Sequence, residues 1–158
     1  MKLKEIKDLD LVRRFIVEDE ELWERVSEDS STKESFIIKE NPYFWWIGCY
    51  NENSVLVGFF WLHHINDVCL QIHAHVKKEY RKDYAYECGK GVIEYFVNKM
   101  PKNYQKLVAE IPVIYPDVIK FTEKFGFVFE GVNKLSCRKN KKVIDQNRYG
   151  LIRSDIKI

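Results

Sequence analysis

The sequence lacks a marked excess of charge of either sign. Its 26 lysines and arginines stand against 24 aspartates and glutamates, which gives a formal net charge of +2. Nucleic-acid-binding domains usually carry a pronounced basic excess, so we expect no nucleic-acid partner. Any anion site must then come from a local cluster of basic residues. One such cluster is present, formed by Lys77, Lys78, Arg81 and Lys82.

Long apolar runs and paired cysteines are also missing. No apolar stretch reaches the roughly 18 residues of a membrane span. The first ten residues, MKLKEIKDLD, contain no apolar segment of a signal peptide. The 4 cysteines have no CxxC spacing, which indicates neither a zinc site nor a disulfide framework. We therefore expect no bound metal, no membrane partner and a cytoplasmic location.

The composition of the chain is that of an ordinary globular protein. The 158 residues contain 46% hydrophobic and 15% aromatic residues, enough for a substantial core. There are no internal repeats, low-complexity segments or linkers. We predict a single domain that spans residues 1–158.

Hydrophobic periodicity predicts an alternation of strands and helices. One broken helix or two short ones are expected within residues 9–26, and further helices at about 84–99 and around 118–125. The order is β-α-α-β-β-β-α-β-α-β-β, an α/β (α+β) fold with a mixed sheet covered on both faces. Strands are expected at residues 2–6, 44–50, 54–65, 68–76, 106–111, 127–132, 134–138 and 143–152.

Residues 68–96 form the most informative stretch. An alternating apolar run is followed by the basic cluster and then by a long helical pattern. A strand, a charged turn and a helix in this order aim unpaired backbone N–H groups and the positive end of the helix dipole at an anion. The alternative is a solvated, charged helix cap.

Several segments resemble the GNAT superfamily of N-acetyltransferases, across almost the whole chain. The sharpest are FTEKFGFVFEG at residues 121–131 and NKLSCRKNKKVIDQNRYGLIRSDI at 133–156. IHAHVKKEYRKDYAYE at 72–87 and VAEIP at 108–112 look closest to uncharacterised acetyltransferase-like proteins of bacteriophages. The resemblance implies transfer of an acetyl group from acetyl-CoA to a primary amine of a small molecule or protein. It also implies a host cytoplasm as location if the chain is phage-encoded, and a possible homodimer that pairs its final strands.

The superfamily holds the CoA pyrophosphate in a turn of pattern Q/R-x-x-G-x-G/A. Arg81 fits its first position, but Tyr84 and Tyr86 replace small residues that let the backbone approach phosphates. The N–H groups of residues 82–86 remain, so we expect a reshaped anion site. The matching residues are Arg81, Lys82, Asp83, Tyr84, Ala85 and Tyr86.

By the same resemblance, the fourth and fifth strands part, and the pantetheine arm inserts between them. The backbone N–H of Val76 is then the expected donor to the developing oxyanion. His73 and His75 share one face of the fourth strand because their spacing is two. Either can act as the base at neutral pH, and His73 is preferred because the phage-type proteins also place a histidine there. Sheet histidines satisfied by their neighbours are the alternative.

Other candidate groups lie on the fifth strand and after it. Glu110 is a further possible base or an anchor for the amine, or simply a structural carboxylate. Many superfamily members protonate the departing thiolate with a tyrosine where this chain has Thr122, a poor acid. Tyr115 could replace it, or could be a packing residue. His63 and His64 are adjacent, so they should point to opposite faces, which disfavours a shared metal ion.

These departures leave a second function open. The chain could be a catalytically inactive member of the fold that serves as a binding or structural module. A phage protein that docks on a host or virion partner would be an example.

Overall fold

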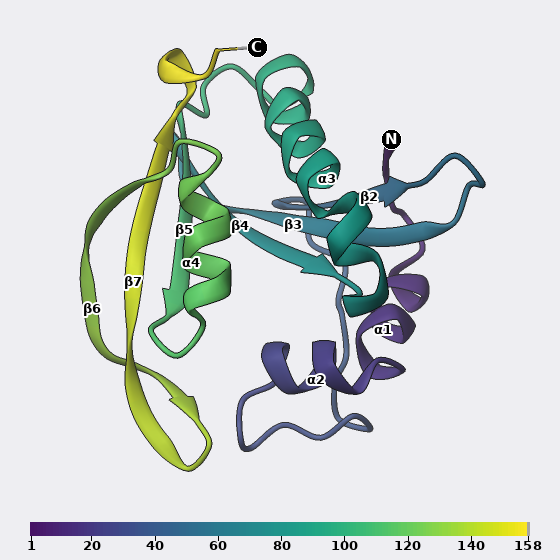
Figure 1. Ribbon diagram of the computed structural model, residues 1–158, viewed down its shortest axis with the longest axis vertical. Helices are drawn as coiled ribbons and strands as arrows, with labels where there is room; N and C mark the ends of the chain where they lie inside the picture. The colour runs from purple at the N-terminus through teal and green to yellow at the C-terminus, as the bar shows by residue number, and fades with distance from the viewer. Residues whose placement is uncertain (158) are drawn as a thin grey trace.

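The computed structural model describes residues 1–157, and it confirms the predicted order of elements and the fold class (Figure 1). The helices are α1 (Leu9–Val17), α2 (Glu20–Val26), α3 (Lys78–Lys99) and α4 (Pro116–Glu123), and a short 3-10 turn, η1 (Arg153–Asp155), follows the last strand. The strands are β1 (Lys2–Glu5), β2 (Phe44–Tyr50), β3 (Leu56–Asn66), β4 (Cys69–Val76), β5 (Lys106–Pro112), β6 (Val128–Lys139) and β7 (Lys142–Ile152).

The strands form one mixed sheet in the order β1-β2-β3-β4-β5-β7-β6. The first four strands are consecutive and antiparallel. β4 and β5 are parallel and joined through α3. β7 inserts between β5 and β6 with antiparallel pairing on both sides.

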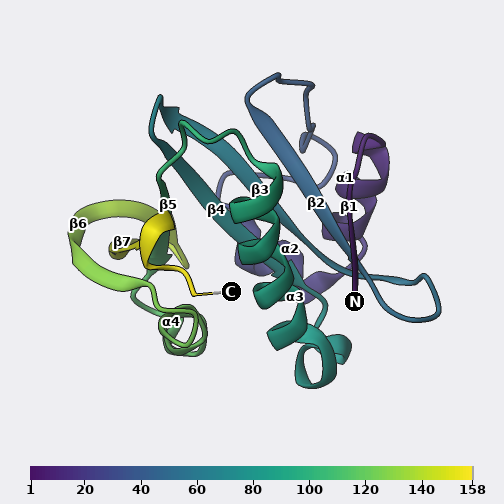
Figure 2. The same cartoon turned by 90° about the horizontal axis from the view of Figure 1, so that it is seen from above.

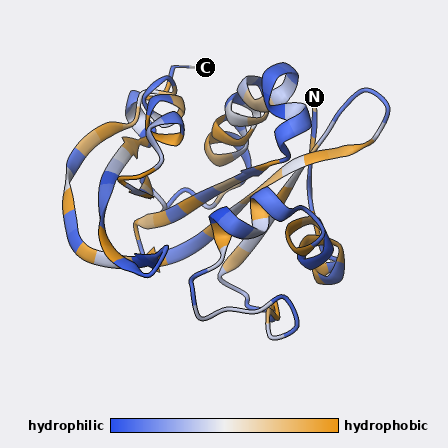
Figure 3. Ribbon diagram, turned by 60° about the horizontal axis from the view of Figure 1, so that its bottom comes forward, coloured by the Kyte–Doolittle hydropathy of each residue, from blue (hydrophilic) through white to orange (hydrophobic). Residues whose placement is uncertain are grey.

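Two hydrophobic clusters cover the two faces of the sheet. α1 and α2 pack against one face around Val12, Phe15 and Phe59. α3 covers the other face around Val92 and Phe96, and Figure 2 shows it lying along one side of β3 and β4. Figure 3 shows hydrophobic segments along the central strands, where alternate side chains enter these two clusters.

The start of α3 differs from the prediction. The helix begins at Lys78, whereas the sequence pattern predicted a charged turn up to about residue 84. Lys, Glu and Arg are good helix formers, and neither Tyr84 nor Tyr86 breaks a helix as the expected glycines would. The segment after β4 therefore continues as helix through the residues expected to form the turn.

The final hairpin also differs in detail. Residues 128–139 form one strand, β6, whereas two separate pieces were predicted. Its pairing with β7 is irregular between Phe129 and Gly131 and again between Asn133 and Cys137. These irregularities explain why the alternating pattern looked interrupted. Within the described residues, no helix is long and apolar enough to cross a membrane.

Candidate functional site

A gap between β4 and β5 is the feature on which the site is built. The two strands pair only from Cys69 opposite Lys106 to Gln71 opposite Val108. β4 nevertheless continues to Val76 and β5 to Pro112. The strands therefore part as the resemblance implies, and the edge of β4 that faces β5 is left without a partner strand.

The register of β4 against β3 shows which groups of this edge are free. Val76 lies opposite Gly58, and the next residue, Lys77, donates its N–H to the carbonyl oxygen of Val57 at 3.2 Å. In an antiparallel ladder this bond flanks a pair of residues that exchange no bonds with each other. The N–H and C=O of Val76 therefore point away from β3, toward the gap, where an oxyanion donor was expected.

His73 and Glu110 flank the beginning of this gap. Each lies two residues beyond the last pair of β4 and β5, so both occupy the sheet face that α1 and α2 cover. The His73 ring stacks on Trp61 with centroids 4.7 Å apart. Its Nε2 lies 3.2 Å from Nε2 of His63. Glu110 forms an ion pair with Arg148 of β7 at 3.1 Å.

Burial governs the ionisation of these histidines. Loss of solvent, followed by the neighbouring His75 and His63, lowers the pKa of His73 to about 3. Burial also lowers the pKa of His63, an effect that its hydrogen bond with the His64 carbonyl oxygen, and then the charge of Glu110, partly oppose. Both rings are thus neutral at pH 7, so one donates a hydrogen to the other. If His73 donates through Nε2, its Nδ1 is free to accept a proton.

His75 lies further along the same face, where it is 9% exposed. Its ring packs against Phe59 with centroids 4.7 Å apart, and burial lowers its pKa to about 4. His63 and His64 point to opposite faces as predicted, since His64 Nδ1 lies 3.0 Å from the Tyr104 hydroxyl.

The expected pyrophosphate turn is helical here. Lys82, Asp83, Tyr84, Ala85 and Tyr86 all lie inside α3, so their N–H groups belong to the helical hydrogen-bond ladder. The unpaired donors of the helix lie at its first turn instead. The Tyr84 hydroxyl donates to Glu52 at 2.9 Å, and the exposed Tyr86 ring stacks on Phe125.

Arg81 is the one residue of the expected turn that reaches back to the gap. Its Nε donates to the carbonyl oxygen of Val76 at 2.9 Å, and its Nη1 donates to Glu21 of α2. Lys78 lies 3.8 Å from the same carboxylate, and Arg25 lies 3.2 Å from it. The hydrogen bond from Arg81 is the main reason that the pKa of Glu21 lies below its usual value.

Tyr115 stands at the start of α4, next to α2. The guanidinium carbon of Arg25 lies 5.1 Å from the centre of its ring, and Arg25 also pairs with Asp117 at 3.0 Å. Burial raises the pKa of Tyr115.

Sequence reasoning missed His63 and Glu21 as members of this region. The pairing of His63 with His73 could have been found, because a meander register brings β3 beside β4. Glu21 carried no signal: it is one of several acids in α2, and 60 positions separate it from Arg81.

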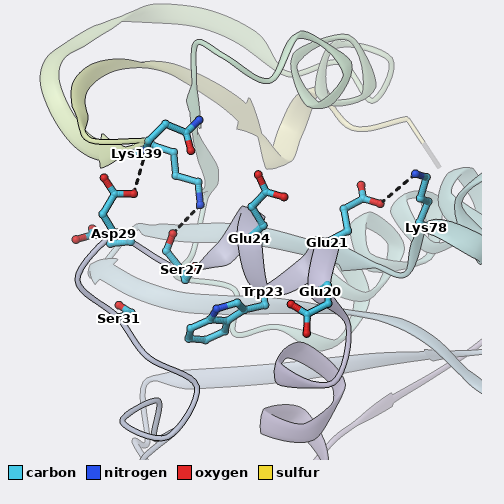
Figure 4. A pocket seen from close by; sticks show the side chains of 11 residues that line it. Glu20, Glu21, Trp23, Glu24, Ser27, Asp29, Ser31, Lys78 and Lys139 are labelled. Atoms are coloured by element: carbon cyan, nitrogen blue, oxygen red, sulfur yellow. Dashed lines mark hydrogen bonds and ion pairs between the residues drawn. The ribbon is translucent and has the colours of Figure 1, made fainter.

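A pocket of about 630 Å³ opens beside Glu21 and Lys78 (Figure 4). It extends to the tip of the β6–β7 hairpin, where the ammonium group of Lys139 donates to the carbonyl oxygen of Ser27 at 2.8 Å. Its walls include five acidic residues, Glu20, Glu21, Glu24, Glu28 and Asp29. Among the described residues, no group of three or more His, Cys, Asp or Glu is arranged to hold a metal ion.

A mixed sheet whose fourth and fifth strands part beside a helix N-terminus defines the acyl-CoA N-acyltransferase class of folds. The profile of the family described as "Acetyltransferase (GNAT) domain" matches residues 1–128. The chain therefore belongs to the GNAT acetyltransferase family.

Solved structures show the same fold. A spermidine N-acetyltransferase from Vibrio cholerae, in complex with CoA and spermine, is 16% identical with a TM-score of 0.78, and the alignment covers 97% of this chain and 95% of that one. A putative acetyltransferase from Acinetobacter baylyi is 19% identical with a TM-score of 0.70, and the coverage is 96% and 92%. No curated protein matches the chain.

Proposed function

We propose that this protein is an acetyl-CoA-dependent N-acetyltransferase that acts on a primary amine of a small molecule or protein. The observation that carries the proposal is the gap between β4 and β5, with the N–H of Val76 directed into it and His73 at its beginning. A pantetheine arm can pair with the free edge of β4 as an additional strand would.

In the proposed reaction, the amine nitrogen attacks the carbonyl carbon of the thioester. A C–N bond forms, the C–S bond breaks, and the thiolate departs. The N–H of Val76 stabilises the carbonyl oxygen as it becomes negative. His73 accepts the proton that the nitrogen loses while its own Nε2 proton moves to His63 across their hydrogen bond, because a ring whose pKa is about 3 is too weak a base to hold the proton alone.

The acidic pocket supports a cationic acceptor. Five carboxylates against two lysines, Lys78 and Lys139, line its walls, which produces a potential that attracts ammonium groups. A related structure was solved with the polyamine spermine. These two observations support an amine with more than one positive charge as the acceptor.

The residues fit the two ends of acetyl-CoA unequally. The gap suits the pantetheine arm, but helical residues 82–86 offer no free N–H groups to the pyrophosphate. Arg81 and Lys78 at the first turn of α3 are the remaining charges for the phosphates.

This misfit favours a second candidate, a catalytically inactive GNAT-fold binding or structural module. The position of Thr122 on α4, where a tyrosine acid is common in the superfamily, points the same way.

Calorimetric titration of acetyl-CoA separates the two candidates. The enzyme requires measurable binding, and the absence of a signal at millimolar ligand would contradict it. We then expect His73→Ala to lower kcat by at least about tenfold with nearly unchanged affinity for acetyl-CoA. Arg81→Ala should instead weaken the affinity. The reverse pattern would show that the two roles are misassigned.

Three further proposals accompany this function. Residues 1–158 form a single GNAT-like domain. β6, at the edge of the sheet, exposes Val128, Phe129, Val132 and Leu135, which supports pairing of two chains through this strand. A bacteriophage origin, suggested by the likeness of residues 72–87, stays a prediction, because the solved relatives named above come from bacteria. A location in the host cytoplasm depends on that origin and stays a prediction too.

A further inference from the structure

We propose that Glu21 sets the affinity of the donor site, because its carboxylate occupies the place on Arg81 and Lys78 that the phosphates of the donor must take. The carboxylate has to leave this place before the phosphates bind. This inference rests on the proposed function, and it adds a residue of α2 to a site otherwise built from β4 and α3.

The contacts of Glu21 are those of a bound anion. It accepts a charge-assisted hydrogen bond from Arg81 Nη1 and lies 3.8 Å from the Lys78 ammonium group. It sits beside the first turn of α3, where unpaired N–H groups and the helix dipole favour negative charge. Arg81 is also fixed from the other side by the Val76 carbonyl oxygen. The Arg81 guanidinium is thereby held on both sides by groups of the chain itself.

The donor phosphates and the Glu21 carboxylate cannot bind Arg81 and Lys78 at the same time. A pyrophosphate placed on Arg81 and Lys78 would approach the Glu21 carboxylate, which contacts both of these side chains. Two negative groups in contact with the same cations repel each other strongly where they are partly shielded from water. The Oε2 atom of Glu21 is buried without a hydrogen-bond partner and lies 3.8 Å from the Lys78 ammonium group, so the carboxylate is only partly satisfied in this place.

Displacement of the Glu21 carboxylate also affects how α2 is attached to α3. The Glu21 side chain is 27% exposed and forms ion pairs with Arg25 on its own helix and with Arg81 on α3. When phosphates replace it on Arg81, α2 loses its ionic link to α3. The first turn of α3 is then free to rearrange around the ligand. Glu21 thus acts as an internal competitor that lowers the apparent affinity for any phosphate-bearing donor.

The test compares Glu21→Gln with Glu24→Gln, a neighbour on α2 that lines the same pocket. We expect calorimetry to show CoA binding about tenfold tighter in Glu21→Gln and within about twofold of wild type in Glu24→Gln. S-Acetylpantetheine lacks the phosphates, so its affinity should be equal in all three proteins. Thermal denaturation confirms that each variant is folded.

The outcomes separate this inference from the proposed function. If wild type binds CoA and Glu21→Gln binds it equally or more weakly, the inference is wrong and the proposed function stands. Equal tightening for S-acetylpantetheine would likewise overturn it, because the effect would not depend on phosphate charge. If no protein binds CoA at millimolar concentration, the proposed function fails and Glu21 has no ligand to compete with.

Discussion

At the scale of single residues, the neutral histidines of β4 carry a consequence for stability. His73 and His75 have pKa values of about 3 and about 4 in the folded chain, because burial disfavours the imidazolium. In the unfolded chain both return to an ordinary value near ~6.5. The unfolded chain therefore binds protons that the folded chain does not, and the stability rises with pH between about 3 and 6.5.

We predict that the free energy of unfolding, measured with urea, falls by about 2 kcal/mol for each histidine between pH 7 and pH 5. His75→Phe places a similar ring against Phe59 without a titrating group. It should remove the share of His75 and leave the shares of His73 and His63, because burial lowers the pKa of His63 as well. Glu21 and Asp117 have lowered pKa values and add their own loss only at more acidic pH. An unchanged slope in His75→Phe would contradict the assigned protonation state.

At the scale of elements, the strands were predictable and the beginning of α3 was not. In residues 44–50 and 68–76, successive side chains point to opposite faces of the sheet, as they do in every strand, so the sequence pattern indicates the strand directly. The extent of a helix depends instead on competition between neighbouring conformations. The resemblance places Tyr84 and Tyr86 in a turn, although tyrosine at these positions also continues a helix. The same ambiguity concealed that residues 82–86 continue the helix, while the parting of β4 and β5 agreed with the resemblance.

Arg25 is the side chain that links α2 to α4. It pairs with Asp117 at 3.0 Å and lies over the Tyr115 ring, and its side chain is 28% exposed. We predict that Arg25→Ala lowers the free energy of unfolding by about 1–2 kcal/mol, or the Tm by about 2–8 °C. Arg14→Ala is the matched control, because Arg14 is 52% exposed and pairs only with Asp10 on its own helix. Equal effects of the two variants would show that the α2–α4 link contributes nothing specific.

At the scale of the whole molecule, the sheet separates two cores, while the edge strand β6 lies largely outside both. The core beneath α3 includes fully buried Phe96. Phe129 on β6 is 51% exposed and packs edge-on against Tyr149 with centroids 5.7 Å apart. The β6–β7 hairpin reaches the rest of the fold at its tip, where Asn140 donates its backbone N–H to Asp29 at 2.9 Å. Sequence patterning identified both phenylalanines as apolar but could not rank them, because burial depends on the order of strands in the sheet.

This arrangement predicts a large difference between two chemically identical substitutions. Phe96→Ala leaves a cavity beneath α3 and should lower the free energy of unfolding by about 3–5 kcal/mol, measured with urea. Phe129→Ala should cost less than about 1 kcal/mol in a monomer, because much of its ring already contacts water. A cost for Phe129→Ala that grows with protein concentration would indicate that β6 is buried between two chains. Equal costs at high dilution would mean that the cores are not divided as the structure has them.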